Sequence, residues 1–287
     1  MLALSRGSQR RRLSLAALLA LSTGCAAGPD PGTPTNPDGG YVPIPDVPTP
    51  PQCRGNRDGV IDRAEVAFAP GVEVRYRINP AATLALVSPH GTERADGSRA
   101  WDFTDPSGSL VTLSLLTTTS QWFASRFPGA QYAARLDPRS ANLGVYRATD
   151  TSVDLMGVAG AAERDGTLVR YDTPPSLLRF PLRVGDTWTA TATTVDSMVE
   201  NTPVASRDRY EITVDAHGEV RVPSLTFADA LRVRVELTQS FPAGPGRRQI
   251  QYLWMVECYG EVARMTSRDG EVDPDFRMAS EFRRLGF

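Results

Sequence analysis

Hydrophobic and polar residues alternate with a period of two along much of the chain after residue 70. The alternation is clear at 72–78 and 231–237, where apolar residues occupy every second position. In the segment 276–282 the large apolar residues share one side, and Arg277 and Glu281 lie on the other. This pattern is typical of antiparallel strands that have one buried face and one solvated face.

Asp-Gly pairs between these segments predict hairpin turns, because glycine readily takes the positive φ angles that tight turns require. The pairs lie at 96–97, 165–166 and 269–270. The pattern gives roughly a dozen strands, and the one helical candidate is short, at 120–127. We therefore predict a mainly β protein over 71–287, built as a curved antiparallel sheet of the half-barrel or sandwich type with one short helix.

The N-terminal residues 1–24 have the features of a targeting segment. Four arginines and no acidic residue precede an apolar run, Leu13–Ser22, that ends in small residues. A run this short falls well below the roughly 20 residues that a membrane-spanning helix needs, so the segment predicts a signal peptide. Residues 25–52 that follow are rich in proline and glycine, and we expect a disordered stalk there.

The end of the signal, LSTGC at Leu21–Cys25, resembles the lipobox of bacterial lipoproteins. The resemblance implies cleavage before Cys25 and attachment of lipid to its sulfur. Ser22 departs from the pattern, since leucine is usual at that position. The small residues Ala26 and Ala27 imply an outer-membrane address. The alternative is an ordinary signal peptide in which Cys25 is incidental.

Three phrases in the second half, FPLRVGDTW, VRVPSLTFADALRVRV and YLWMVECYGEVAR, resemble a broad group of secreted bacterial proteins and lipoproteins of unknown function. The group's fold resembles the open antiparallel half-barrel of lipoprotein carriers. The resemblance implies scaffold roles, with Gly185 turning the chain and Trp188 and Trp254 filling a core. It implies an envelope location and no particular activity. Glu257–Tyr259 departs from the small residues usual at that point.

Composition and motifs favour binding over catalysis. Without residues 1–24 the chain has 27 arginines and no lysine, against 33 acidic residues, and this mildly acidic balance argues against a nucleic-acid partner. His90 and His217 each precede a glycine in a predicted turn, and neither has a second ligand at zinc-binding spacing. Asp273 and Asp275 fit a solvated turn better than an acid–base pair. We therefore expect no enzyme.

Cys53 and Cys258 are the two cysteines that remain after Cys25. Exported proteins fold in an oxidising compartment, so a disulfide between the two is the natural inference. Two free buried thiols are the alternative.

The stretch after Cys53 fits part of a calcium-loop template. Arg54 stands where the first carboxylate ligand belongs, and a proline-rich segment precedes the loop. The segment 53–70 is therefore a degenerate EF-hand-like loop. It is either a calcium site or a turn followed by one capped helical turn. Its candidate ligands are Asn56, Asp58, Val60 through its carbonyl, Asp62 and Glu65.

Four aromatic residues could line a ligand cavity on the concave face of the sheet: Trp101, Trp122, Phe123 and Phe127. The last three could equally form a plug that covers the sheet. Taken together, the sequence predicts a cell-envelope lipoprotein, attached to the outer membrane through its lipid, with a binding or structural role toward another envelope protein. The alternatives are a periplasmic carrier of a lipid or other apolar ligand and a calcium-binding envelope protein.

Overall fold

The computed structural model describes residues 53, 55–66 and 68–286, which belong to one compact unit. The predicted signal, Cys25 and the stalk lie outside the described residues. Within the described residues no helix is both long and apolar enough to cross a membrane.

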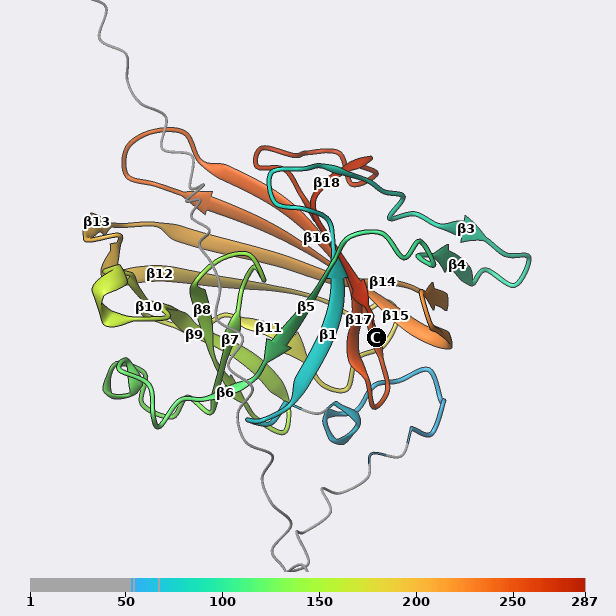
Figure 1. The fold of residues 1–287 in the computed structure, drawn as a ribbon, viewed down its shortest axis with the longest axis horizontal. Helices are drawn as coiled ribbons and strands as arrows, with labels where there is room; N and C mark the ends of the chain where they lie inside the picture. The colour runs from blue at the N-terminus through green and yellow to red at the C-terminus, as the bar shows by residue number, and fades with distance from the viewer. Residues whose placement is uncertain (1–52, 54, 67, 287) are drawn as a thin grey trace, which may run out of the picture. The chain divides into compact units, whose positions relative to one another are not determined.

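The fold is a nearly closed antiparallel β-barrel of thirteen strands, which confirms the predicted mainly β class (Figure 1). Each strand pairs with the next. Their order around the barrel is β5 (Ser109–Ser114), β1 (Glu73–Ile78), β18 (Met278–Leu285), β17 (Gly260–Ser267), β16 (Arg247–Val256), β15 (Leu225–Ser240), β14 (Arg207–Val222), β12 (Thr187–Val199), β10 (Leu168–Tyr171), β9 (Ser152–Gly160), β8 (Asn142–Ala148), β7 (Tyr132–Arg135) and β6 (Leu116–Thr117).

The two ends of this series meet without pairing. β5 contacts β7 at a seam that has no hydrogen-bonded ladder among the described residues. β5 runs almost directly into β6 through Leu115, so one continuous segment lies at both ends of the series. The predicted half-barrel is therefore closed further than an open sheet, and the seam is its one break within the described chain.

The strands bend around the barrel at bulges, which insert an extra residue and increase local twist. β12 pairs with β14 through residues 187–193 and with β10 through residues 194–198, and the β10 pairing contains a register shift between Val195 and Met198. β14 and β15 form a long hairpin whose register shifts twice. His217 lies between the two shifts and pairs with Leu231. The predicted turn at His217 is wrong, because β14 continues through it in regular pairing with β15.

Five short strands lie outside the barrel order. β2 (Ala85–Leu86), β3 (Thr92–Glu93) and β4 (Arg99–Asp102) form a flap, in which β4 runs parallel to the end of β14. Figure 1 shows β3 and β4 extending to one side of the barrel. β11 (Ser176–Arg179) pairs with β9, and β13 (Thr202–Val204) pairs with β12. The Asp96–Gly97 pair turns between β3 and β4, as predicted, with Gly97 at φ 83°.

Helical structure is limited to three single turns of 3-10 helix in the described chain: Arg63–Glu65, Ala124–Arg126 and Glu163–Asp165. The predicted helix at 120–127 is therefore only one turn long. Pro128 and Gly129 follow it immediately, and Gly129 takes a positive φ of 82° that no helix continues through.

Side chains are buried on both surfaces of the barrel wall. Inside, one end is packed by Ile61, Leu182, Trp188 and their neighbours. Outside, Trp101 of the flap packs with Trp254 against β14–β18. Phe123 and Phe127 cover the outer surface of β7–β9 as the predicted plug. The predicted buried side of 276–282 is found on the outer surface of β18, where Phe282 packs against Phe103. The predicted solvated side is wrong at Glu281, which is buried and lines the cavity.

Candidate functional site: a barrel cavity with a charged end

The barrel contains a cavity of about 930 Å³ that is partly open to solvent. The cavity is the part of the barrel interior that side chains do not fill. It extends from Val66 and Phe68 to β18. Pockets that hold small ligands occupy roughly 300–1,000 Å³. The space is therefore large enough for a small molecule.

Most of the cavity wall is apolar. Inward-facing side chains alternate along the strands, so strands on opposite sides each place aliphatic groups in the same space. Leu113 comes from β5, Leu155 from β9, Leu177 from β11 and Leu237 from β15. Aromatic rings complete this wall, and they come from Phe68, Tyr132, Tyr146, Tyr171 and Tyr210.

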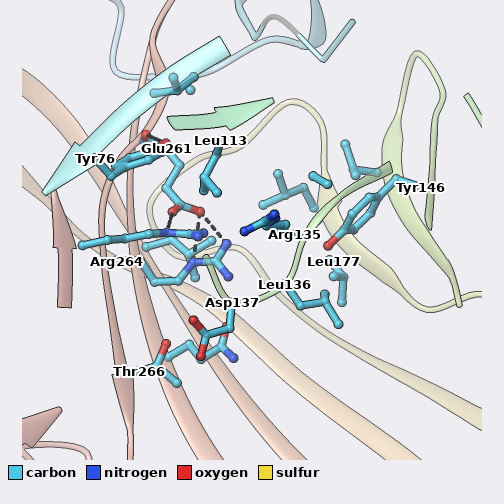
Figure 2. Close-up of a pocket in the computed structure, with 18 of the residues that line it drawn as sticks. Tyr76, Leu113, Arg135, Leu136, Asp137, Tyr146, Leu177, Glu261, Arg264 and Thr266 are labelled. Atoms are coloured by element: carbon cyan, nitrogen blue, oxygen red, sulfur yellow. Dashed lines mark hydrogen bonds and ion pairs between the residues drawn. The ribbon is translucent and has the colours of Figure 1, made fainter. Parts of the chain in front are cut away.

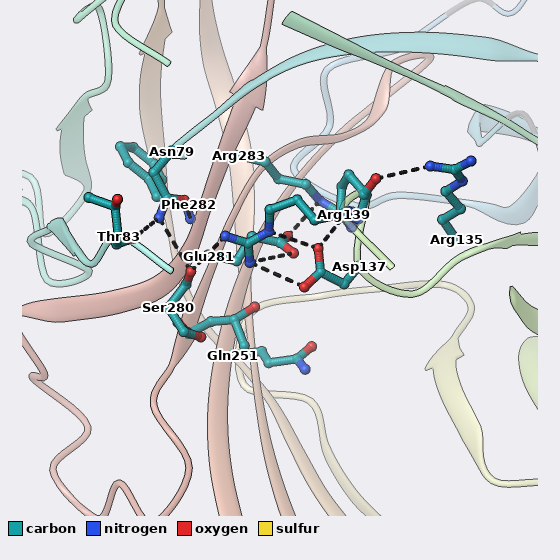
Figure 3. Close-up of polar contacts among 12 residues, drawn as sticks. Asn79, Thr83, Arg135, Asp137, Arg139, Gln251, Ser280, Glu281, Phe282 and Arg283 are labelled. Carbon is teal, nitrogen blue, oxygen red and sulfur yellow. Dashed lines mark hydrogen bonds and ion pairs between the residues drawn. The ribbon is translucent and has the colours of Figure 1, made fainter. Parts of the chain in front are cut away.

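Charged side chains gather on one side of the cavity, as Figures 2 and 3 show. We call this set the arginine cluster. It comprises Arg135, Asp137, Arg139, Glu261, Arg264, Glu281 and Arg283, all of which line the cavity. β17 and β18 supply four members, and the strand end and turn after β7 supply three. The cluster therefore joins two strands on one side of the seam to the connection on the other.

Glu261 is the centre of the cluster. Its Oε1 accepts a hydrogen bond from Nε of Arg283 at 2.7 Å. Its Oε2 accepts from Nε of Arg264 at 3.1 Å and also from Nη2 of the same guanidinium. The hydroxyl of Tyr76 donates to the Glu261 carbonyl oxygen at 2.7 Å. The Glu261 carboxylate thus binds both Arg264 and Arg283, and all three side chains are largely shielded from solvent.

The second carboxylate of the wall, Glu281, is less well satisfied. Its Oε1 lies 3.5 Å from Nε of Arg283, and its Oε2 lies 3.9 Å from Nη2 of Arg139. Arg139 instead pairs with Asp137 at 3.0 Å and donates to the Ser280 carbonyl oxygen at 3.2 Å. Within the described residues, Oε1 of Glu281 makes no hydrogen bond.

The two glutamates consequently differ in acidity. Burial raises the pKa of Glu261, but the guanidinium groups of Arg264 and Arg283 outweigh burial and hold the pKa below its usual value. Burial also raises the pKa of Glu281, and there the guanidinium groups offset only part of the effect. The arginines therefore stabilise the ionised form of Glu261 more effectively than that of Glu281.

Hydroxyl groups lie near the cluster. Figure 2 shows Arg135 pointing toward Glu261 and Arg264, with Tyr146 beyond Arg135. Burial raises the pKa of Tyr146, so its hydroxyl stays protonated and can donate a hydrogen bond. The wall thus combines apolar surface, hydroxyl donors and guanidinium donors in one space.

The described residues of the segment 53–70 pack against the barrel beside the start of β17. Ile61 and Leu182 exchange backbone hydrogen bonds of 3.0 and 2.9 Å, and Val66 and Phe68 line the cavity. Cys53 and Cys258 form a disulfide, as the cysteine count predicted. The Cys258 amide also donates to the Glu65 carbonyl oxygen. The disulfide therefore holds this segment against the barrel.

The structure also places the candidate calcium ligands. Asn56 and Asp58 hydrogen-bond to each other at 3.0 Å, and Glu65 Oε2 accepts from the Asp62 amide at 2.9 Å as in a helix cap. Val60 donates its amide to Asp58 Oδ1 at 2.8 Å. Among the described residues no three His, Cys, Asp or Glu side chains converge to hold a metal ion. Calcium binding here stays a prediction.

The four predicted cavity aromatics lie elsewhere. Trp101, Trp122, Phe123 and Phe127 are absent from the lining of the large cavity. The Trp101 indole donates to the Pro89 carbonyl oxygen at 2.9 Å beneath the flap. The prediction that these residues line the cavity is therefore wrong, because they pack on the outer surface of the barrel.

The histidines and the acidic pair also lie away from the cavity. His90 Nδ1 lies 3.0 Å from Asp275 Oδ1 in an exposed pair between two loops. His217 is exposed on β14, and the Asp273 carboxylate accepts from the Asp275 amide at 2.9 Å. None of these four side chains lines the cavity.

The arginine cluster was not identified from the sequence. The alternation along β18 assigned Glu281 to a solvated face, because charged residues in strands usually face water. One feature of the sequence could have indicated the cluster. Each of the last two strands carries acidic and basic residues close together, in EVAR at 261–264 and EFRR at 281–284. Alternation alone does not distinguish a wet outer face from a wet cavity.

Comparisons with known proteins add little. No protein-family model matches the sequence, and no curated protein matches it. One similar solved structure is a protein of Bacteroides fragilis NCTC 9343 described as a "putative exported protein with YmcC-like fold". It is 12% identical over 76% of this chain and 96% of the other, with a TM-score of 0.36. A similarity this low supports no conclusion about function.

Proposed function

We propose that this protein is an extracytoplasmic binding protein that holds an apolar small molecule in its barrel. The observation that carries the proposal is the cavity of about 930 Å³ with its mostly aliphatic and aromatic wall. Exposed apolar surface in water is unfavourable, and a ligand that covers it gains roughly 25 cal/mol for each Å² removed from water. The alternative of a carrier is therefore favoured over a purely structural role.

Two features support a location outside the cytoplasm. Disulfides persist in oxidising compartments, and Cys53–Cys258 joins the first described residue to the barrel. The LSTGC sequence that ends at Cys25 resembles a lipobox. We propose that lipid on Cys25 attaches the protein to the outer membrane through the 25–52 segment.

Binding rather than catalysis fits the chemistry of the cavity wall. His90 and His217 do not line the cavity, and its buried acids Glu261 and Glu281 lie beside arginines. Such a wall can orient a ligand by charge and shape, so we assign the cavity a binding role.

Fluorescence of the neutral dye N-phenyl-1-naphthylamine tests the proposal, because the dye brightens in apolar surroundings. We expect saturable one-to-one binding to the wild-type protein. Leu113→Trp fills part of the cavity and should weaken binding about tenfold or more, the effect of 1–3 kcal/mol of overpacking.

Leu110→Trp is the matched control, because Leu110 lies on the same strand, is 45% exposed and does not line the cavity. Its dye affinity should equal that of the wild type. Absence of saturable binding, or equal weakening by both substitutions, would show that the cavity does not bind apolar molecules.

A further inference from the structure

The arginine cluster is an unusual feature for an apolar cavity. Charged groups are costly to remove from water, and buried charges are normally paired and fully hydrogen-bonded. Four guanidinium groups here face three carboxyl groups. Positive charge therefore exceeds negative charge on this side of the cavity even when all three carboxyl groups are ionised.

Hydrogen bonding within the cluster is also incomplete. The Arg283 side chain is 6% exposed, yet its Nη1 has no hydrogen-bond partner among the described residues. Arg264 uses Nε and Nη2 on Glu261. A buried guanidinium donor without a partner, as at Nη1 of Arg283, marks a place where an acceptor is missing.

A third guanidinium is available at the seam. Arg135 is the last residue of β7, is exposed and lines the cavity, and its Nη1 donates to the Pro138 carbonyl oxygen at 3.1 Å. No carboxylate within the described residues pairs with it. Figure 2 shows its side chain directed toward Glu261 and Arg264, so it lies opposite the donors of β17 and β18.

We propose that the arginine cluster binds the anionic group, a carboxylate or a phosphate, of an amphipathic ligand whose apolar part lies among the leucines and tyrosines of the cavity. This proposal rests on the proposed function and specifies the class of ligand. Guanidinium groups match both anions geometrically, because each presents parallel N–H donors to two oxygens. The Tyr146 hydroxyl supplies one more donor beside Arg135.

Competition against N-phenyl-1-naphthylamine tests the proposal with three probes that share a twelve-carbon chain: dodecanoate, dodecyl phosphate and the neutral dodecanol. In the wild type we expect at least one of the two anions to displace the dye at a concentration about tenfold or more below that of dodecanol, as one charge-assisted hydrogen bond provides. The two anions distinguish a carboxylate from a phosphate ligand. Inorganic phosphate alone should not displace the dye.

Two substitutions assign the preference to the cluster. Arg264→Gln and Arg135→Gln should reduce it to about threefold or less, the loss expected when a charged donor is removed. The measured quantity is the ratio of anion to dodecanol competition within each variant, and a thermal melt of each variant shows that it is folded. Arg135 makes one hydrogen bond within the described chain, so its variant is expected to fold even if Arg264→Gln does not. Arg209→Gln is the control, because Arg209 is an exposed arginine paired with Glu211 outside the cavity.

Each outcome decides a different claim. Equal competition by both anions and dodecanol in the wild type would overturn the anion site while leaving an apolar binding function. A preference that survives both arginine substitutions would place the anion elsewhere and overturn the proposal as well. A wild-type protein that does not bind the dye would overturn the proposed function, and the anion site with it.

Discussion

Removing the charge of Glu261 is the sharpest perturbation of the cavity wall. Glu261 is 14% exposed in its side chain and holds Arg264 and Arg283 together. Deleting one partner of a buried ion pair costs about 3–5 kcal/mol, because the remaining charge is left uncompensated. Glu261→Gln keeps one amide oxygen as an acceptor, so we expect the lower end, about 3 kcal/mol. For a unit of this size that corresponds to a Tm lower by about 6–12 °C.

The pH dependence adds a second check. The pKa of Glu261 is below its usual value of 4.5 in the folded protein, so its ionised form stabilises the fold. This contribution is complete above pH 4.5 and is lost as pH falls through the lower folded pKa. The Tm difference between wild type and Glu261→Gln should therefore be full at neutral pH and shrink in acid.

Scanning calorimetry at a series of pH values measures both effects. Glu211→Gln is the control, because Glu211 and Arg209 form an exposed pair whose loss should change stability by about 0.5 kcal/mol or less. The same Glu261→Gln protein should bind dodecanoate more tightly, since its two arginines lack their carboxylate. An unchanged Tm, or a difference that persists undiminished in strong acid, would refute this account of the cluster.

Three further predictions concern the scaffold and the anchor. Reducing the Cys53–Cys258 disulfide, which closes a loop of 205 residues, should lower the unfolding free energy by up to about 5 kcal/mol in urea titrations, and an unchanged midpoint would contradict this. Gly218→Ala should loosen β4 and raise hydrogen exchange there, because an added Cβ would meet a backbone oxygen of β4 at 1.9 Å; unchanged exchange in β4 would refute the contact. Cys25→Ala should move the protein from the membrane fraction to the soluble fraction, and retention in the membrane would refute lipid anchoring.

The strands could be predicted from sequence because barrel strands alternate between two environments. Val74 and Tyr76 on β1 and Val233 and Val235 on β15 occupy every second position, and the predicted strands are found there. Alternation does not show whether the polar face of a strand lies in solvent or in an internal cavity. On β18 it separated Phe282 from its charged neighbours correctly and then assigned those neighbours to solvent.

The features that could not be predicted from the sequence depend on contacts between segments that are far apart in the chain. β16–β18 are buried on their outer surface because the flap packs against them, and nothing within these strands encodes that contact. The charged inner surface becomes a site only where the connection after β7 meets β17 and β18 across the barrel. His217 shows the limit of local signals, because a His-Gly pair that is suited to a turn lies here within a continuous strand. The disulfide could be predicted without knowledge of the fold, because Cys53 and Cys258 are the two cysteines that remain after Cys25.

Native mass spectrometry of the protein purified from its own host tests the central claim most directly. The cavity is expected to retain its ligand during mild purification. We predict a bound species, beyond the polypeptide and its acyl chains, that leaves on denaturation and carries a carboxylate or phosphate on an apolar body. A spectrum that contains only the bare lipidated polypeptide would contradict a ligand-binding barrel and favour a structural role.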